Sequence, residues 1–316
     1  MSYIEHMQMD KDIVRLGAFK GENELEFISR FGTKESCLEY LANYKWRDGF
    51  YCISCGCTES YQSKQNKHYK ICKSCIRLVS PTSQTLFHKV KFGIEKAFYI
   101  VFKMSATTKS ISAEQLAKTV GINRKSALLF QHKVRAAMTS DGDHPMKGEV
   151  EVDEAFIGGY EEGKVGRGAD KKALVSVAIQ KNGATGIKRM YAMVIQDAST
   201  TELKKIFDKH ISKQAEVLTD KWRSYTRISE DFSVTQEKSD PGKNFKLMHR
   251  AIQQLKSWIR GIHHSVDSKY LQGYLDEFCY RINRSIHKDT IFDNLLQRMT
   301  YAQPMTKNQW KSSNCA

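Results

Sequence analysis

The stretch from Gly148 to Gly159, GEVEVDEAFIGG, decides the fold of this chain. Its residues alternate, so that Val150 and Val152 fall on one side of an extended segment, while the acidic residues ending with Asp153 fall on the other. A period of two with β-branched residues predicts a β-strand, and the two closing glycines predict its end. A carboxylate such as Asp153 inside an apolar strand is costly to bury, and a bound cation is the usual way to neutralise it. The alternative is that Asp153 points to solvent from an edge strand.

The composition indicates a basic protein with a polyanionic partner. The chain has 316 residues, enough for two or three small domains, and carries 50 Lys and Arg against 35 Asp and Glu, a net charge of +15. Such an excess favours nucleic acid as the partner. No apolar run approaches the roughly 18 residues that a membrane span needs, and the N-terminus lacks the apolar region of a signal peptide. We therefore expect a cytoplasmic, nucleoid-associated protein with no membrane partner.

Paired cysteines mark a metal site. The chain contains eight cysteines, and four of them form two Cys-x-x-Cys pairs, at Cys52, Cys55, Cys72 and Cys75. Two such pairs at this separation predict a tetrahedral structural Zn²⁺ site. Tyr51 and Tyr69 beside the pairs are expected in strands, which favours a zinc ribbon at residues 46–85. Cys57 fits neither pair and is a spare. A redox dithiol is the alternative, but it leaves one pair unexplained.

Helical patterns surround the ribbon. Apolar residues at three-and-four spacing predict a helical segment over residues 1–45, with Thr33 as an N-cap. In the helical region at residues 86–140, Ser112 caps one helix, Gly121 makes a turn and Asn123 opens a second helix, which is the pattern of a helix-turn-helix. A plain helical hairpin is the alternative. The DNA-contacting candidates on the second helix are Arg124, Lys125, Lys133 and Arg135.

After a turn-rich linker at residues 140–147, a mixed sheet is expected. Strands are predicted at residues 173–180 and 188–196 after the opening strand and a loop at residues 161–172, then a capped helix at residues 199–213 and a strand at 217–218 that leads to Asp220. A fifth strand at 232–236 and helices at 245–261 and 268–284 follow. Three strands, a helix and a fourth strand that ends in an acid form the order of an RNase H-like core, which brings Asp153 and Asp220 together. The predicted class is therefore α+β and multidomain, with this core at residues 147–300 and a tail at 301–316.

Several motifs in register resemble a known family. A four-cysteine ribbon followed by VDEAFIGG, TDKWRSY, HRAIQQLKSWIRGIHH and YLDEFCYRINR resembles bacterial insertion-sequence transposases of the DDE class that carry an N-terminal zinc ribbon. The resemblance extends from Cys52 to Arg284. It implies an enzyme that binds terminal inverted repeats, cuts double-stranded DNA at the element ends and joins a 3′-hydroxyl to target DNA, with two catalytic Mg²⁺ or Mn²⁺ ions.

The resemblance also assigns site residues. Its first two acids fall on Asp153 and Asp220. Its third metal position lies seven residues before a lysine, Lys256, and so falls on His249, a departure from the family's glutamate. Imidazole is a poor ligand for Mg²⁺, and Glu277 is the rival third acid. We expect a structural role for Glu277, paired with Arg281 four residues on, and a phosphate or DNA-end contact for Lys256.

Other readings stay open. Trp222 and Trp258 either stack on displaced bases or belong to the core. A degenerate DNA-binding relative without catalysis, or another RNase H-like nuclease such as a junction resolvase, would share much of this sequence pattern. Two DNA ends must be brought together in transposition, so the resemblance implies a homodimer or a higher oligomer on DNA.

Overall fold

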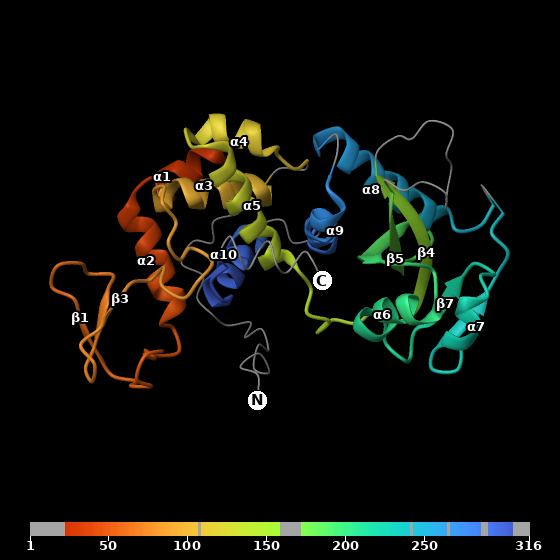
Figure 1. The fold of residues 1–316 in the computed structure, drawn as a ribbon, viewed down its shortest axis with the longest axis horizontal. Helices are drawn as coiled ribbons and strands as arrows, with labels where there is room; N and C mark the ends of the chain where they lie inside the picture. Colours follow the sequence, from red (N-terminus) through yellow and green to blue (C-terminus); the bar gives the residue numbers. More distant parts are fainter. Residues whose placement is uncertain are drawn as a thin grey trace.

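The computed structural model describes residues 23–106, 109–158, 172–240, 243–263, 266–285 and 290–305. Most of the expected loop at 161–172 and of the expected tail lies outside these residues. Figure 1 shows a helical body that carries the small ribbon at one end, and a second body built on a larger sheet. The predicted α+β class is confirmed.

The helical body has one aromatic core. Phe27, Phe31 and Phe98 pack with Phe292 from the far end of the chain. The helices that share this core are α1 (Glu24–Phe31), α2 (Lys34–Lys45), α3 (Ile94–Ala106), α4 (Ala113–Val120), α5 (Arg124–Met138) and α10 (Ile291–Tyr301).

Helix α10 departs from the predicted organisation. The sequence did not reveal it as a helix, and residues 147–300 were expected to form one catalytic domain. Instead Phe292 and Leu295 bury themselves among the N-terminal helices, and Asp293 accepts a hydrogen bond of 2.6 Å from Tyr40. The polypeptide therefore returns to the helical body after completing the second body.

The predicted helix caps are present. The Thr33 side chain accepts a hydrogen bond from the backbone N–H of Ser36, and the Ser112 side chain accepts one from Gln115. Gly121 ends α4 in the left-handed region, with φ of 64°, and Asn123 caps α5. These short-range signals set the two-helix unit of α4 and α5 as expected.

The ribbon is a three-stranded antiparallel sheet of β1 (Ser60–Gln62), β2 (Lys70–Cys72) and β3 (Leu78–Val79). Tyr51 and Tyr69 were expected in strands, but both lie outside them, Tyr69 directly before β2. Short strands are sufficient here because the cysteine knuckles organise the turns.

The second body contains a five-stranded mixed sheet in the order β6-β5-β4-β7-β8. Strand β4 pairs antiparallel with β5 and parallel with β7. The prediction that the first and fourth strands of this region lie side by side is confirmed. The strands are β4 (Glu149–Gly158), β5 (Lys172–Asn182), β6 (Gly186–Ile195), β7 (Glu216–Thr219) and β8 (Ser233–Gln236).

Helices cover both faces of this sheet. The Val150 and Val152 side packs on α6 (Thr200–His210) and α7 (Ser224–Ile228), whereas the Ala155 side packs on α8 (Lys246–His263) and α9 (Ser268–Asn283). Helix α9 also contacts α5, so it joins the two bodies. Among the described residues, none of the helices is both long and apolar enough to cross a membrane.

Candidate active site

The two predicted acids meet where the parallel pairing of β4 with β7 ends. Val152 of β4 pairs with Thr219 of β7, so Asp153 and Asp220 are the next residues in the same register. The Asp220 carboxylate accepts a hydrogen bond of 3.0 Å from the backbone N–H of Trp222. Because the strands run parallel and in this register, the two acids lie at the same level of the sheet, Asp153 within β4 and Asp220 directly after β7.

Asp153 is held in a costly environment. Its side chain is 23% exposed. Burial raises the pKa of Asp153, and the nearby Asp220 carboxylate raises it further; the backbone N–H of Glu154, His249 and Lys256 oppose this, and the resulting pKa is about 6. A group that is both desolvated and placed beside a like charge favours the binding of a proton or of another cation.

Helix α8 brings the other predicted residues to the acids. His249 Nε2 lies 3.8 Å from Asp153 Oδ2. Lys256 is two helical turns further on, on the same side of α8. Burial lowers the pKa of Lys256, as do its cationic neighbours, while Asp153 acts in the opposite direction. The structure therefore brings together the four residues selected as catalytic from the sequence.

The acids offer hard oxygen ligands suited to Mg²⁺ or Mn²⁺, whereas His249 offers a nitrogen that suits Mn²⁺ better. In the described part of the chain, only the four cysteines hold their ligand atoms all within 4.8 Å of one another. The donor atoms of Asp153, Asp220 and His249 are therefore spread more widely than those of the cysteine group.

Glu151 is a residue that sequence reasoning passed over. It lies two positions before Asp153 on the same side of β4, is 5% exposed, and lies 3.9 Å from Lys181 at the nearest N–O approach. Burial raises the pKa of Glu151, whereas Lys181, the backbone N–H of Met248 and His249 lower it. The alternating pattern of β4 was the signal, since it places Glu151 and Asp153 on one face.

Glu277, the rival third acid, belongs to the core. It is 0% exposed and lies between two arginines, 2.9 Å from Arg135 Nε and 2.9 Å from Arg281 Nη2. Burial alone would raise the pKa of Glu277, but the two guanidinium groups outweigh burial and lower it to about 2. The predicted contact with Arg281 is present. Arg135, which comes from α5, was not anticipated as a partner.

The two tryptophans differ. Trp258 is 9% exposed, and its ring centroid lies 5.4 Å from that of Phe278, as the core reading predicted. Trp222 is half-buried, and its Nε1 donates a hydrogen bond of 2.9 Å to Ala198 O. Of the two tryptophans, Trp222 is therefore the one that presents surface, in the segment directly after Asp220.

The basic residues of α5 divide into two groups. Arg124 and Lys125 are exposed at the start of the helix, as a DNA contact requires. Lys133 and Arg135 were expected to contact DNA as well, but they are 7% and 1% exposed. Lys133 donates to the carbonyls of Leu86 and His88, and Arg135 pairs with Glu277. The prediction fails for these two because the second half of α5 is covered by the segment before α3 and by α9, not by solvent.

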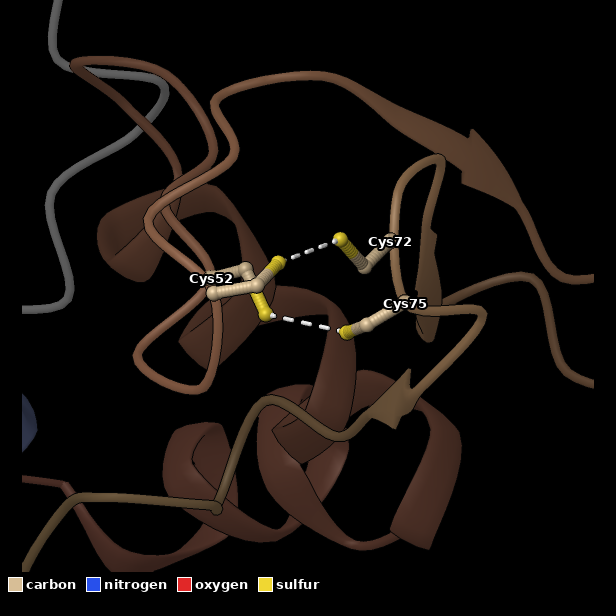
Figure 2. A group of neighbouring side chains, drawn as sticks. Cys52, Cys72 and Cys75 are labelled. Atoms are coloured by element: carbon tan, nitrogen blue, oxygen red, sulfur yellow. Dashed lines mark hydrogen bonds between the residues drawn. The ribbon is translucent and has the colours of Figure 1, made fainter.

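The four predicted zinc ligands converge. Figure 2 shows Cys52, Cys72 and Cys75 turned toward one another from two loops of the ribbon. The sulfur of Cys52 lies 3.6 Å from that of Cys75, and Cys55 lies 3.5 Å from Cys72. Sulfurs about 2.3 Å from a tetrahedral zinc would be separated by nearly this distance. Cys57 is not in the group, so the cluster fits a metal ion held by four thiolates.

Comparison with known proteins places the second body in a family. Residues 145–283 match the model of a family described as the ISXO2-like transposase domain. An uncharacterized protein in transposable element ISH50 of Halobacterium salinarum is 23% identical over 225 residues, which cover 66% of this chain and 75% of that protein.

Among solved structures, the simian T-cell lymphotropic virus intasome in complex with PP2A regulatory subunit B56 gamma matches at 11% identity, over 68% of this chain and 69% of that chain. Its TM-score is 0.24, which is too low to support a conclusion. The family model and the relative from a transposable element support the resemblance to insertion-sequence transposases drawn from the motifs, with the similarity to a transposase domain at residues 145–283.

Proposed function

We propose that this chain is a DDE-class transposase with an RNase H-like core, which cuts DNA at the ends of its element and transfers the resulting strand. The observation that carries the proposal is the acid pair: Asp153 and Asp220 follow paired residues of adjacent parallel strands, and Asp153 has its pKa raised to about 6. Carboxylates placed this way suit two divalent cations, Mg²⁺ or Mn²⁺, with His249 as the third ligand.

The chemistry divides between the ions and the protein. Divalent ions held here would activate water or a 3′-hydroxyl and stabilise the leaving oxygen of the phosphodiester. The chain's own residues supply the rest. Asp153 within β4 and Asp220 directly after β7 fix the ion positions, and Lys256 provides a cation for a phosphate of the DNA end. His249 lies on one side of Asp153, with its Nε2 3.8 Å from Asp153 Oδ2.

DNA binding is assigned to the helical body. Arg124 and Lys125 stand exposed at the start of α5, after the turn at Gly121, where a recognition helix contacts base edges. The net charge of +15 adds attraction for terminal inverted repeats and target DNA. Joining two ends calls for a homodimer or a higher oligomer on DNA, and DNA as the substrate implies a cytoplasmic, nucleoid-associated location.

The ion in the ribbon is proposed to be zinc. Elemental analysis of protein repurified after mild chelation should give one zinc per chain, and Cys72→Ser should lose it, because three thiolates and water hold zinc less tightly. Cys57→Ser is the matched control and should keep the metal. Zinc retained in full by Cys72→Ser would contradict the assignment.

A second candidate is a DNA-binding relative that has lost catalysis. The observation that favours it is His249, an imidazole where the resemblance places a carboxylate. This candidate predicts binding to the repeats without metal-dependent cleavage. Another RNase H-like nuclease fits less well, because the ribbon and the two-helix unit suit recognition of particular ends.

The test is a cleavage assay with the full-length protein. Duplex DNA carrying the repeats that flank its gene is incubated with Mg²⁺, Mn²⁺ or chelator, and the cut strands are mapped. We expect a nick that leaves a 3′-hydroxyl at the element end, only with a divalent ion, followed by joining to a second DNA. Specific binding with no cut in either metal would favour the second candidate.

A further inference from the structure

A cavity of about 1010 Å³ opens on the side of the sheet that faces α6 and α7, and neither Asp153 nor Asp220 lines it. Phe156 of β4 and Trp222 after β7 both line it. Phe156 follows Asp153 within β4, and Trp222 follows Asp220 in the segment after β7. The cavity and the acids therefore share one end of the sheet but lie on opposite faces, and nothing in the proposed chemistry uses the cavity.

The lining of this cavity combines two kinds of surface. Phe156, Leu174 and Trp222 supply an apolar floor, and the cations Lys172, Arg223 and Arg227 lie around it. None of these three cations forms an ion pair with a carboxylate of the described residues. The cavity also has one acid, Asp197, whose carboxylate accepts a hydrogen bond of 2.9 Å from Ser199 N.

The walls of the cavity are tied together and to Asp220. Ala198 O accepts hydrogen bonds from Trp222 Nε1 at 2.9 Å and from Ser224 Oγ at 2.7 Å. Thr200 Oγ1 donates to Ser224 O at 3.1 Å. The segment before α6 and the segment before α7 thus form one unit, and the backbone N–H of Trp222 anchors that unit to the Asp220 carboxylate.

We propose that this cavity binds an unpaired nucleotide of the DNA substrate, with its base on the Trp222 and Phe156 floor and its phosphate against Arg223 and Arg227. This inference rests on the proposed function. Bases stack on aromatic rings whatever their sequence, and a groove with unpaired cations attracts the sugar-phosphate backbone. The volume exceeds what a single nucleotide fills, so the neighbouring sugar and phosphate also fit. Strand separation at the element end would supply this nucleotide, and its binding would hold Asp220 in position.

The experiment compares two DNA probes on full-length protein in chelator, so that no cleavage occurs. One probe is a blunt duplex of the element end, and the other is the same duplex with a short unpaired extension. Fluorescence anisotropy at fixed salt gives the ratio of the two affinities. We expect the parent to prefer the extended probe about tenfold, the size of effect that one stacked base produces. An extension of abasic sugars should lose most of this preference.

Two variants change the cavity at exposed positions, where the fold tolerates substitution. Arg223→Gln with Arg227→Gln removes the phosphate contacts, and Thr201→Glu places a negative charge at the rim. Both should reduce the preference to about one- to twofold. Lys118→Gln with Lys188→Gln is the charge-matched control on exposed residues away from the cavity. It should weaken both probes equally and keep the ratio.

The outcomes are separable from those of the cleavage assay. The inference is overturned if the parent shows no preference, if both cavity variants keep it, or if abasic and normal extensions bind alike. Any of these results can occur in a protein that cuts DNA with Mn²⁺, in which case the proposed function stands and the cavity assignment alone fails.

Discussion

Two clusters of charged residues in this protein contain buried carboxylates and behave in opposite ways. Glu277 is enclosed by Arg135 and Arg281, and its pKa falls to about 2. Asp153 lies beside Asp220, and its pKa rises to about 6. Both groups are desolvated, so the neighbours make the difference: two guanidinium groups in one case, a second carboxylate in the other.

The comparison separates a structural charge from a functional one. In the Glu277 cluster the carboxylate is paired with two arginines, and the pair with Arg135 holds α9 of the sheet body against α5 of the helical body. The Asp153 cluster costs folding free energy, which folds retain mainly where a ligand or a reaction uses the group. The opposite pKa shifts thus distinguish Glu277, which pairs with arginines in the fold, from Asp153, the acid that we propose performs chemistry.

The largest effect is expected from removing a charge of the acid pair. Asp220→Asn should lower cleavage and strand joining by two to three orders of magnitude, because it removes a fixed charge from the reacting centre, and should leave end binding almost unchanged. Gel-based cleavage and anisotropy measure the two properties. Asp208→Asn, an exposed acid on α6, is the control and should cut normally. An Asp220→Asn variant as active as the parent would remove Asp220 from the site.

At Glu277 the expected effect is on the stability of the fold, not on the chemistry. Glu277→Gln should destabilise the fold by about 3–5 kcal/mol, because it leaves the buried guanidinium of Arg135 and the partly buried one of Arg281 without their anion. The cause can be checked by pH. The pKa is 4.5 ordinarily and about 2 in the fold, so the stabilisation is complete above pH 4.5 and disappears as the pH falls toward 2.

Urea unfolding should give the free energy of unfolding of the parent and of Glu277→Gln across this pH range. The difference between the two proteins should shrink as the pH falls from 4.5 toward 2. The exposed pair of Glu149 with Lys181 supplies the control, since Glu149→Gln should change stability little. A Glu277→Gln protein that is fully folded but catalytically dead would reverse the comparison, because it would make Glu277 the third ligand.

A smaller effect is expected at His249, which lies beside Asp153. His249→Ala should lower cleavage about tenfold or more, and the parent should work better with Mn²⁺ than with Mg²⁺, since Mn²⁺ accepts imidazole more readily. His249→Glu should retain or improve the use of Mg²⁺. Initial rates in the two metals give the answer, and normal cutting by His249→Ala would show that α8 does not provide the third ligand.

The smallest effect is a gain in stability. In metal-free protein at pH 7, Asp153→Asn should be more stable than the parent by about 1–3 kcal/mol, because the ionised carboxylate is disfavoured in the fold. The pKa of Asp153 is raised from 3.8 to about 6. The penalty is therefore full above pH 6, shrinks between pH 6 and 4, and is absent at lower pH, where both states are protonated. Thermal unfolding with and without Mn²⁺ tests this, and a variant less stable than the parent at pH 7 would contradict it.

The sequence by itself determined the features that depend on short-range pattern. Two Cys-x-x-Cys pairs define a metal knuckle within a few residues, and Ser112, Gly121 and Asn123 set helix ends through local backbone hydrogen bonds. Alternation in GEVEVDEAFIGG placed Asp153 on one face of a strand. The pairing of β4 with β7 was also predictable, because the order of strands and helices restricts the possible sheets.

Tertiary structure alone decided which side chains are covered. Arg124 and Arg135 belong to one helix and look alike in the sequence. Arg124 is exposed, whereas Arg135 is buried and pairs with Glu277, which lies far along the chain. The return of α10 to the N-terminal core and the cavity between β4 and α7 arise in the same way. Periodicity predicts which residues share one face of a helix. The segment that covers this face comes from a distant part of the sequence, so the burial, the pKa and the exposed charge of each side chain are decided only when the two bodies pack.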